Sequence, residues 1–144
     1  MNGHGKYTFS NGNYYVGNFK NGLFNGKGVL RYATGDVYEG YFENSMMSGY
    51  GTYTFGNNAK YIGEFQNGLK HGKGKMLYSS GTTFDGNWEN DKPNGYMEYT
   101  DQLGNNYKGC FIDGYKEGKG EVKFIDQSYF KGDYVKDCWE GIYF

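Results

Sequence analysis

Residues 61–74 read YIGEFQNGLKHGKG, and this pattern recurs every 23 residues along the whole chain. Of the 26 glycines, all but Gly56 fall on only five positions of the repeated unit. Sequence repeats with a fixed period of about 20–50 residues are typical of stacked arrays, in which each unit buries one face on its neighbours. The sequence therefore predicts a repeat array, whose first property is an extended surface.

The repeat divides the chain without insertion or deletion. The predicted single array spans residues 1–144, with a partial unit 1–14, full units 15–37, 38–60, 61–83, 84–106 and 107–129, and a partial unit 130–144. Because the chain begins and ends part-way through a unit, we expect a longer parent chain, a partner on an uncovered strand edge, or self-association.

Each unit has the pattern of one β-hairpin. Residues 61–65 follow the pattern aromatic-x-Gly-x-aromatic and residues 72–78 the pattern Gly-x-Gly-x-apolar-x-aromatic, which is a period of two, and neither segment shows a helical period. Asn67-Gly68 and Ser80-Gly81 mark turns after the two segments. The predicted fold is all-β: an elongated, solenoid-like array of stacked antiparallel hairpins, curved and twisted, without helices.

Aromatic side chains gather on one face of the predicted sheet. With the first residue of each unit (such as Tyr61) as position 0, positions 0, 4, 15 and 17 share a face and hold 20 of the 30 aromatic residues. Glycines at positions 2, 11 and 13 lie on the same face, where a bare backbone lets a ring lie flat on the neighbouring chain.

This aromatic, glycine-lined groove is the predicted partner-binding site, because large exposed apolar surfaces usually mark interfaces. Its central candidates are Tyr38, Phe42, Tyr61, Phe65, Phe84 and Trp88. The alternative interpretation is that these rings only pack on one another and on the glycines.

A second period of 46 residues is superimposed on the first. Position 15 alternates between aromatic and aliphatic residues, as in Tyr53 and Met76. Position 7 holds glycine only in every other unit: Gly22, Gly68 and Gly114 alternate with Ser45, Asp91 and Asp137. We interpret this alternation as a double unit, in which large and small side chains interdigitate between neighbouring hairpins.

The charges are unevenly distributed. Lys70, His71, Lys73 and Lys75 form the densest basic cluster. They are candidates for contact with an anionic lipid headgroup or an acidic protein segment, and the alternative is an ordinary solvated face. Residues 1–83 carry eight Lys or Arg against four Asp or Glu, whereas residues 84–144 carry seven against twelve. These net charges of +4 and −5 favour a partner bound in one orientation.

Several function classes find little support. The net charge of −1 and the lack of a basic stripe argue against nucleic acid. The only histidines, His4 and His71, occupy different repeat positions without a nucleophile beside them, so we expect no catalytic residues, no cofactor and no metal. Cys110 and Cys138 are predicted to be reduced thiols of an intracellular protein. No apolar run approaches the ~20 residues that span a bilayer.

The pattern Tyr-x-Gly-x-aromatic-x-x-Gly-x-x-x-Gly-x-Gly, clearest in 61–74 and 15–28, resembles the MORN repeat (membrane occupation and recognition nexus). The resemblance covers the whole chain. It departs in unit 84–106, where Asp91, Met97 and Asp101 replace two glycines and an aromatic residue, and in the last unit, where Asp137 and Tyr143 replace glycine.

The resemblance implies a non-catalytic scaffold. MORN proteins typically belong to cytoskeletal, ciliary or cell-division assemblies, or are modules of lipid kinases and other regulators. We therefore expect a cytoplasmic protein of the cytoskeleton, with cilium, flagellum or axoneme as the specific setting, that docks partner proteins along the groove. The alternatives are a module that associates with anionic phospholipid and recruits or regulates an enzyme, and a regulatory array that is part of a larger enzyme.

Overall fold

The computed structural model describes residues 2–112, 115–135 and 138–143, without the side chains of residues 117, 134, 135 and 138–143. The predicted departure at Asp137 and the glycine at position 114 therefore lie outside the described residues, and of Tyr143 and Cys138 only the backbone is described. The described chain forms thirteen strands: β1 (Gly3–Thr8), β2 (Tyr14–Lys20), β3 (Leu23–Arg31), β4 (Val37–Glu43), β5 (Met46–Thr54), β6 (Lys60–Gln66), β7 (Leu69–Leu77), β8 (Thr83–Glu89), β9 (Lys92–Thr100), β10 (Asn106–Ile112), β11 (Tyr115–Lys123), β12 (Tyr129–Val135) and β13 (Cys138–Tyr143).

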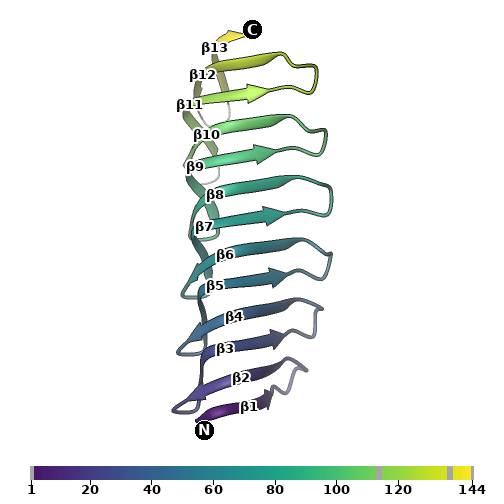
Figure 1. Cartoon of the computed structure of the whole chain (residues 1–144), viewed down its shortest axis with the longest axis vertical. Coiled ribbons are helices and arrows are strands. Elements are labelled where there is room, and N and C mark those ends of the chain that lie inside the picture. Colours follow the sequence, from purple (N-terminus) through teal and green to yellow (C-terminus); the bar gives the residue numbers. More distant parts are fainter. Residues whose placement is uncertain (1, 113–114, 136–137, 144) are drawn as a thin grey trace.

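The thirteen strands form one open antiparallel sheet in sequence order. Successive hairpins stack along a single axis, bend near one end, and place the two chain ends at opposite ends of the array (Figure 1). The predicted fold is confirmed. The residues described above contain no helix, and so none that is long and apolar enough to cross a membrane.

The tight turn between β6 and β7 follows the Asn-Gly signal. Asn67 and Gly68 adopt φ values of 51° and 80°, as a type I′ turn requires. Asp91 occupies the glycine position with a φ of 70°. Its backbone N–H donates to the carbonyl of Lys70 (3.2 Å), and its Oδ1 accepts a hydrogen bond from the backbone N–H of Lys70 (2.7 Å). Neighbouring hairpins are thereby joined at their turns.

The same side-chain bond occurs two hairpins earlier. Ser45 has a φ of 65°, and its Oγ accepts a hydrogen bond from the backbone N–H of Phe24 (3.1 Å). Gly22 and Gly68, at the turns that precede Ser45 and Asp91 by one unit, have no side chain with which to accept such a bond. This alternation is the one expected of a 46-residue double unit.

A bulge bends each described full hairpin. Between Gly63 and Phe65 of β6 the register shifts, so that Glu64 lies opposite the segment between Lys70 and Gly74 of β7. Gly72 lies inside that segment with a φ of 71°, in the left-handed region that favours glycine. Left-handed φ values recur at position 11 in Gly3, Gly26, Gly49, Gly95 and Gly118. Backbone conformation therefore explains the glycine at this position in these units, rather than a place on the aromatic face.

Glycines at positions 2 and 13 have a different role, because a tyrosine ring lies on them. Gly40 and Gly51 are paired across β4 and β5. A Cβ on Gly40 would lie 2.6 Å from the Oη of Tyr38. That hydroxyl donates to the carbonyl of Tyr41 at 2.9 Å. Tyr15, Tyr61 and Tyr107 make the same hydrogen bond in their own units, at 2.7, 2.9 and 3.2 Å.

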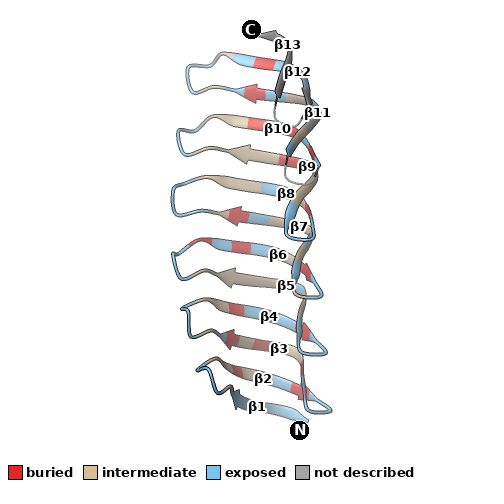
Figure 2. Ribbon diagram, turned by 180° about the vertical axis from the view of Figure 1, so that it is seen from behind, coloured by how far each residue is buried: buried red, intermediate tan, exposed pale blue. Residues whose placement is uncertain are grey.

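The core is a single layer of side chains on the aromatic face of the sheet. Buried positions recur from strand to strand, whereas the loops are mostly exposed or half-buried (Figure 2). The buried residues are Tyr15, Phe19, Phe24, Leu30, Tyr38, Phe42, Ala59, Tyr61, Phe65, Met76, Trp88, Met97, Tyr107, Phe111, Val122 and Phe130. Since no second layer of the described chain covers this face, rings at its surface stay partly accessible.

Candidate docking surface

Five of the six predicted groove residues lie in the core. Tyr38 and Tyr61 are 0% exposed, and Phe42, Phe65 and Trp88 are at most 6% exposed. Their rings pack edge to face across neighbouring hairpins; for example, Tyr38 and Phe65 have centroids 5.1 Å apart, and Tyr61 and Trp88 5.4 Å apart. These five rings form the floor of the aromatic face. Partner contact through them remains a prediction, whereas their role in packing is evident.

The accessible part of the aromatic face consists of other rings. Phe9, Tyr32, Tyr53, Phe55, Phe84, Tyr99 and Phe124 are partly buried against the core, and Tyr78 is exposed. Except for Phe84, all of them occupy positions 15 and 17 of the unit. The sequence places these positions on the aromatic face, but only the packing shows that the rings at positions 0 and 4 lie beneath them.

Three hollows open on this face. Hollow 1 has a volume of about 460 Å³ and is lined by Tyr7, Phe9, Asn13, Phe19, Gly22, Phe24, Leu30, Tyr32 and Ser45. Hollow 2, of about 240 Å³, is lined by Tyr32, Met47, Tyr53, Phe55, Phe65, Gly68, Lys70 and Asp91. Hollow 3, of about 120 Å³, is lined by Tyr99, Asp101, Asn105, Asn106, Tyr107, Lys116, Val122 and Phe124.

The hollows follow the 46-residue double unit. Tyr7, Tyr53 and Tyr99 are 46 residues apart, and each lines one hollow. Position 9 gives the same series, with Phe24 in hollow 1, Lys70 in hollow 2 and Lys116 in hollow 3. The second period that is visible in the sequence therefore produces one hollow for every two hairpins.

The chemistry of the hollows changes along the array. No charged side chain lines hollow 1. In hollow 2 the Nζ of Lys70 lies 3.8 Å from the Oδ1 of Asp91. The same Nζ lies 5.8 Å from the ring centroids of Phe55, Tyr61 and Trp88, within the range of cation–π attraction.

Hollow 3 carries a lysine in the same way. The Nζ of Lys116 lies 5.5 and 5.4 Å from the ring centroids of Tyr99 and Tyr107. The carboxylate of Asp101 is held within its own loop, where it accepts hydrogen bonds from the backbone N–H groups of Leu103 and Asn105 and from the Asn105 side chain. These bonds lower the pKa of Asp101 against the opposing effect of burial. Hollow 3 therefore presents an ammonium group next to aromatic rings.

The predicted basic cluster is divided between two faces. Lys70 lies on the aromatic face, in hollow 2. His71, Lys73 and Lys75 are exposed and alternate with inward residues along β7, so they lie on the opposite, outer face. There the carboxylate of Glu64 accepts a hydrogen bond from the backbone N–H of Lys73 at 2.9 Å. The four residues do not form one cationic patch, and only the outer three remain candidates for contact with an anionic surface.

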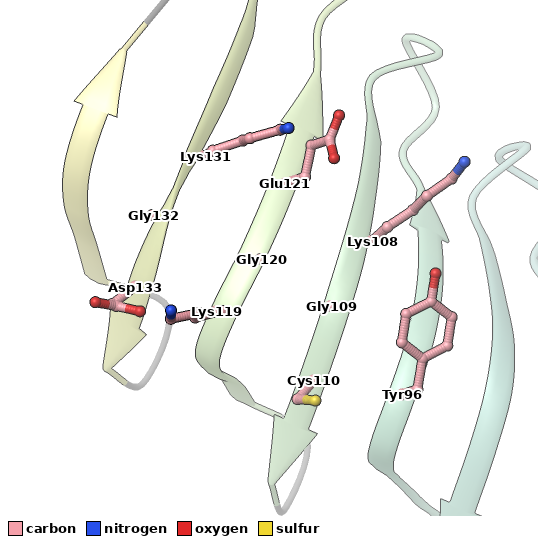
Figure 3. Close-up of a pocket in the computed structure, with 10 residues that line it drawn as sticks. All are labelled: Tyr96, Lys108, Gly109, Cys110, Lys119, Gly120, Glu121, Lys131, Gly132 and Asp133. Atoms are coloured by element: carbon pink, nitrogen blue, oxygen red, sulfur yellow. The ribbon is translucent and has the colours of Figure 1, made fainter.

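A further hollow of about 750 Å³ lies on the outer face (Figure 3). Gly109, Gly120 and Gly132 lie along its floor, on three adjacent strands. Its walls are Tyr96, Lys108, Cys110, Lys119, Glu121, Lys131 and Asp133, and Lys131 extends toward Glu121 as Lys119 does toward Asp133. Sequence reasoning missed this hollow, because the trough results from the relative positions of β10, β11 and β12. Its mixed charges favour no single ligand.

Buried tyrosines are the titratable groups with the most perturbed environment. Burial raises the pKa of Tyr38 to about 12, opposed in part by its hydrogen bond to the carbonyl of Tyr41. Burial also raises the pKa of Tyr53, whose hydroxyl donates to the Oδ2 of Asp36 at 2.7 Å. These phenols stay protonated at neutral pH and serve packing and hydrogen bonding. Within the described part of the chain, no three His, Cys, Asp or Glu residues come together as metal ligands.

Comparisons with known proteins agree with this description. A family model described as MORN repeat matches residues 1–14, 15–37, 38–60, 61–83, 84–100 and 107–129. No curated protein matches the chain. Among solved structures, the chain is similar to the SAS-4 (dCPAP) TCP domain of Drosophila melanogaster, solved in complex with a proline-rich motif of Ana2 (dSTIL). The TM-score is 0.57 at 15% identity, over 90% of this chain and 71% of that one. At this identity the similarity shows the fold alone.

Proposed function

The chain belongs to the MORN repeat family, and we propose that it is a non-catalytic scaffold that holds segments of partner proteins along its aromatic face. MORN repeats generally serve as binding modules. The observation that carries the proposal is the series of three hollows lined by partly accessible aromatic rings, with Tyr32 shared between the first two. Rigid aromatic rings offer a large contact area at little cost in side-chain entropy.

The similar solved structure supports this mode of binding. The SAS-4 domain has a similar fold and was solved in complex with a proline-rich motif of another protein. An elongated sheet with one uncovered aromatic face has the shape that such a segment needs. We place the scaffold in a cytoskeletal assembly, with a ciliary or axonemal one as the more specific form, and this placement rests on the family resemblance.

The proposal is tested by comparing two alanine variants in native pull-downs. Tyr32→Ala removes a ring from hollows 1 and 2, whereas Tyr50→Ala removes a ring that is 59% exposed on the outer face. If circular dichroism shows both variants to be folded, we expect Tyr32→Ala to lose specific partners that Tyr50→Ala retains. The same partners retained by both variants would contradict binding at the aromatic face.

A second candidate is an association with anionic phospholipid, which recruits or regulates an enzyme. The observation that favours it is the exposure of His71, Lys73 and Lys75 on one face of β7. Lys73→Glu combined with Lys75→Glu should then abolish co-sedimentation with phosphatidylserine vesicles and leave partner capture intact. Vesicle binding that survives this double substitution, or that is absent from the unaltered chain, would rule out this candidate.

A further inference from the structure

The two parts of the array differ in the charge of their outer face, where outward side chains form three rows across the strands. Between β3 and β4 the paired residues of these rows are Lys27 with Tyr41, Val29 with Glu39, and Arg31 with Val37. In β1–β7 the rows hold six cations, Lys6, Lys27, Arg31, Lys60, Lys73 and Lys75, and two carboxylates, Glu39 and Glu64. In β8–β12 they hold four cations, Lys108, Lys119, Lys123 and Lys131, and four carboxylates, Asp85, Glu98, Glu121 and Asp133. The rows therefore carry a net charge of +4 in β1–β7 and of zero in β8–β12.

The cations of β1–β7 are accessible to a ligand. All six are exposed, and none of them forms an ion pair with a described residue. The excess of positive charge is greatest in β1–β3, where the rows contain Lys6, Lys27 and Arg31 but no carboxylate. In the second part of the array, by contrast, Lys119 extends toward Asp133 (Figure 3). The first part therefore presents positive charge that the chain itself does not balance.

A hollow lies in the most basic part of this face. Hollow 4 has a volume of about 330 Å³ and is lined by His4, Val16, Gly17, Asn18, Lys27, Gly28, Val29 and Glu39. Its residues occupy the same repeat positions as those of the 750 Å³ hollow, 92 residues earlier in the chain. Val16 and Val29 take the places of Lys108 and Glu121. The same trough therefore offers apolar side chains beside Lys27 at one end of the array and charged walls at the other.

Exposed tyrosines continue from hollow 4 along the array. Lys27 of β3 is paired with Tyr41 of β4. The register shift between β4 and β5 places Tyr41 opposite a segment that includes Tyr50, and both rings are exposed. Lys73 lies two strands beyond Tyr50, on β7. At about 4.8 Å per strand, Lys27 and Lys73 are about 19 Å apart, with the two tyrosines between them.

This pattern favours an acidic peptide over a continuous polyanion. The carboxylates of Glu39 and Glu64 interrupt the cations. A nucleic-acid strand in a duplex carries one charge about every 3.4 Å, and an anionic membrane is negative throughout, so both would place negative charge against these carboxylates. An extended peptide covers 19 Å in about six residues and can place uncharged residues there. Its backbone groups stay hydrated, because the outer face is open to water.

We propose that the outer face of β1–β7 binds an acidic segment of a partner protein in an extended conformation. One carboxylate of the segment lies beside Lys27 at hollow 4, and a second lies beside Lys73, about six residues away. Apolar residues between them pack on Tyr41 and Tyr50. This surface is on the opposite side of the sheet from hollows 1–3, so the inference goes beyond the scaffold function of the aromatic face and does not depend on it.

The test measures binding of fluorescent peptides to the full chain by fluorescence anisotropy at about 50 mM salt, where screening is weak. The probe has two glutamates at each end, the inner pair about six residues apart, and two leucines among serines between them. The control peptides carry glutamine in place of every glutamate, or serine in place of both leucines. Oligothymidylate and phosphatidylserine vesicles represent the other polyanions. We expect the probe to bind about tenfold more tightly than the glutamine peptide, and more tightly than the serine peptide.

Variants with matched controls assign the binding to this surface. Lys27→Glu should weaken binding of the probe about tenfold, whereas Lys119→Glu, at the same repeat position 92 residues further on and opposite Asp133, should not change it. Tyr50→Ala should weaken binding, whereas Tyr96→Ala, which removes an exposed ring 46 residues further on, should not. Circular dichroism confirms that each variant is folded.

Several results would overturn the inference. These are equal affinity for the probe and the glutamine peptide, equal effects of Lys27→Glu and Lys119→Glu, no binding of the probe, and tighter binding of oligothymidylate. Vesicle binding that Lys27→Glu abolishes, without binding of the probe, would assign the surface to lipid instead. Tyr32→Ala changes only the aromatic face and should leave binding of the probe unchanged, so that face is tested separately.

Discussion

Met97 lies over Gly86, which is at position 2 of its unit. In units that begin with a tyrosine, the ring of that tyrosine lies over the glycine at the same position. A Cβ on Gly86 would lie 3.1 Å from the Sδ of Met97, much as a Cβ on Gly63 would lie 2.9 Å from the Oη of Tyr61. Met97 is 0% exposed, whereas Phe84, the first residue of the same unit, is only partly buried and packs on Tyr99 at a centroid distance of 4.6 Å. Two departures from the repeat therefore compensate each other.

This compensation predicts coupling between two substitutions. Met97→Gly alone should lower the free energy of unfolding by about 2–4 kcal/mol, because it empties a buried site. Phe84→Tyr alone should cost about 1 kcal/mol, because Met97 blocks the site that would receive the ring. Together the two substitutions restore the tyrosine–glycine pattern. The loss in free energy of unfolding of the double variant, measured by urea denaturation, should therefore be about 1–3 kcal/mol smaller than the sum of the losses of the two single variants. Additive costs would contradict the compensation.

The glycines at positions 13 and 11 should respond differently to alanine. In Gly51→Ala the new Cβ would lie 2.6 Å from the Cζ of Tyr38 and displace the ring, at a cost of about 3 kcal/mol. In Gly49→Ala the described atom nearest to the new Cβ is the Cβ of Tyr41 at 3.8 Å, so there is no clash. The left-handed φ of 67° is unfavourable for alanine and should lower the free energy of unfolding by about 1–2 kcal/mol. Urea denaturation of the two variants measures the difference. A larger cost for Gly49→Ala would contradict this assignment.

The tyrosine hydroxyls at position 0 should contribute to stability, and those on the outer face should not. Tyr38→Phe removes a hydrogen bond of 2.9 Å to the carbonyl of Tyr41 and should cost about 1–2 kcal/mol. The matched control is Tyr41→Phe, which changes a side chain that is 52% exposed and should leave the thermal midpoint unchanged. Thermal denaturation followed by circular dichroism compares the two, and equal midpoints would refute the prediction.

The array should lose stability in alkali. The pKa of Tyr38 is raised from 10.0 to about 12 by burial, and burial raises those of Tyr15, Tyr53 and Tyr61 as well. At pH values between the pKa of the unfolded chain and the raised pKa of the folded chain, the unfolded chain binds fewer protons than the folded chain. The free energy of unfolding therefore falls as pH rises through this range. Urea midpoints should be constant below about pH 9 and fall between about pH 10 and 12. Tyr38→Phe should flatten that decline, and an unchanged slope would contradict the role given to Tyr38.

Much of the fold and part of the site could be read from the sequence. The 23-residue spacing and the alternation within Tyr61–Phe65 determined the hairpin array, and the position-7 alternation of Gly22 and Ser45 indicated the double unit. Local residue chemistry is sufficient for these features, because a hairpin that recurs in one register can bury its aromatic side only on its neighbours.

Only the tertiary structure decided which rings a partner can reach. The rings of Tyr38 and Tyr61 lie flat on glycine pairs and become the floor, whereas Tyr32 and Tyr53 remain accessible above them. It also showed that Lys70 lies in hollow 2 beside Asp91, away from Lys73 on the outer face. Sequence alone determined that there is an aromatic face, and cross-strand packing determined its accessible surface, because burial depends on what each neighbouring strand places above a ring.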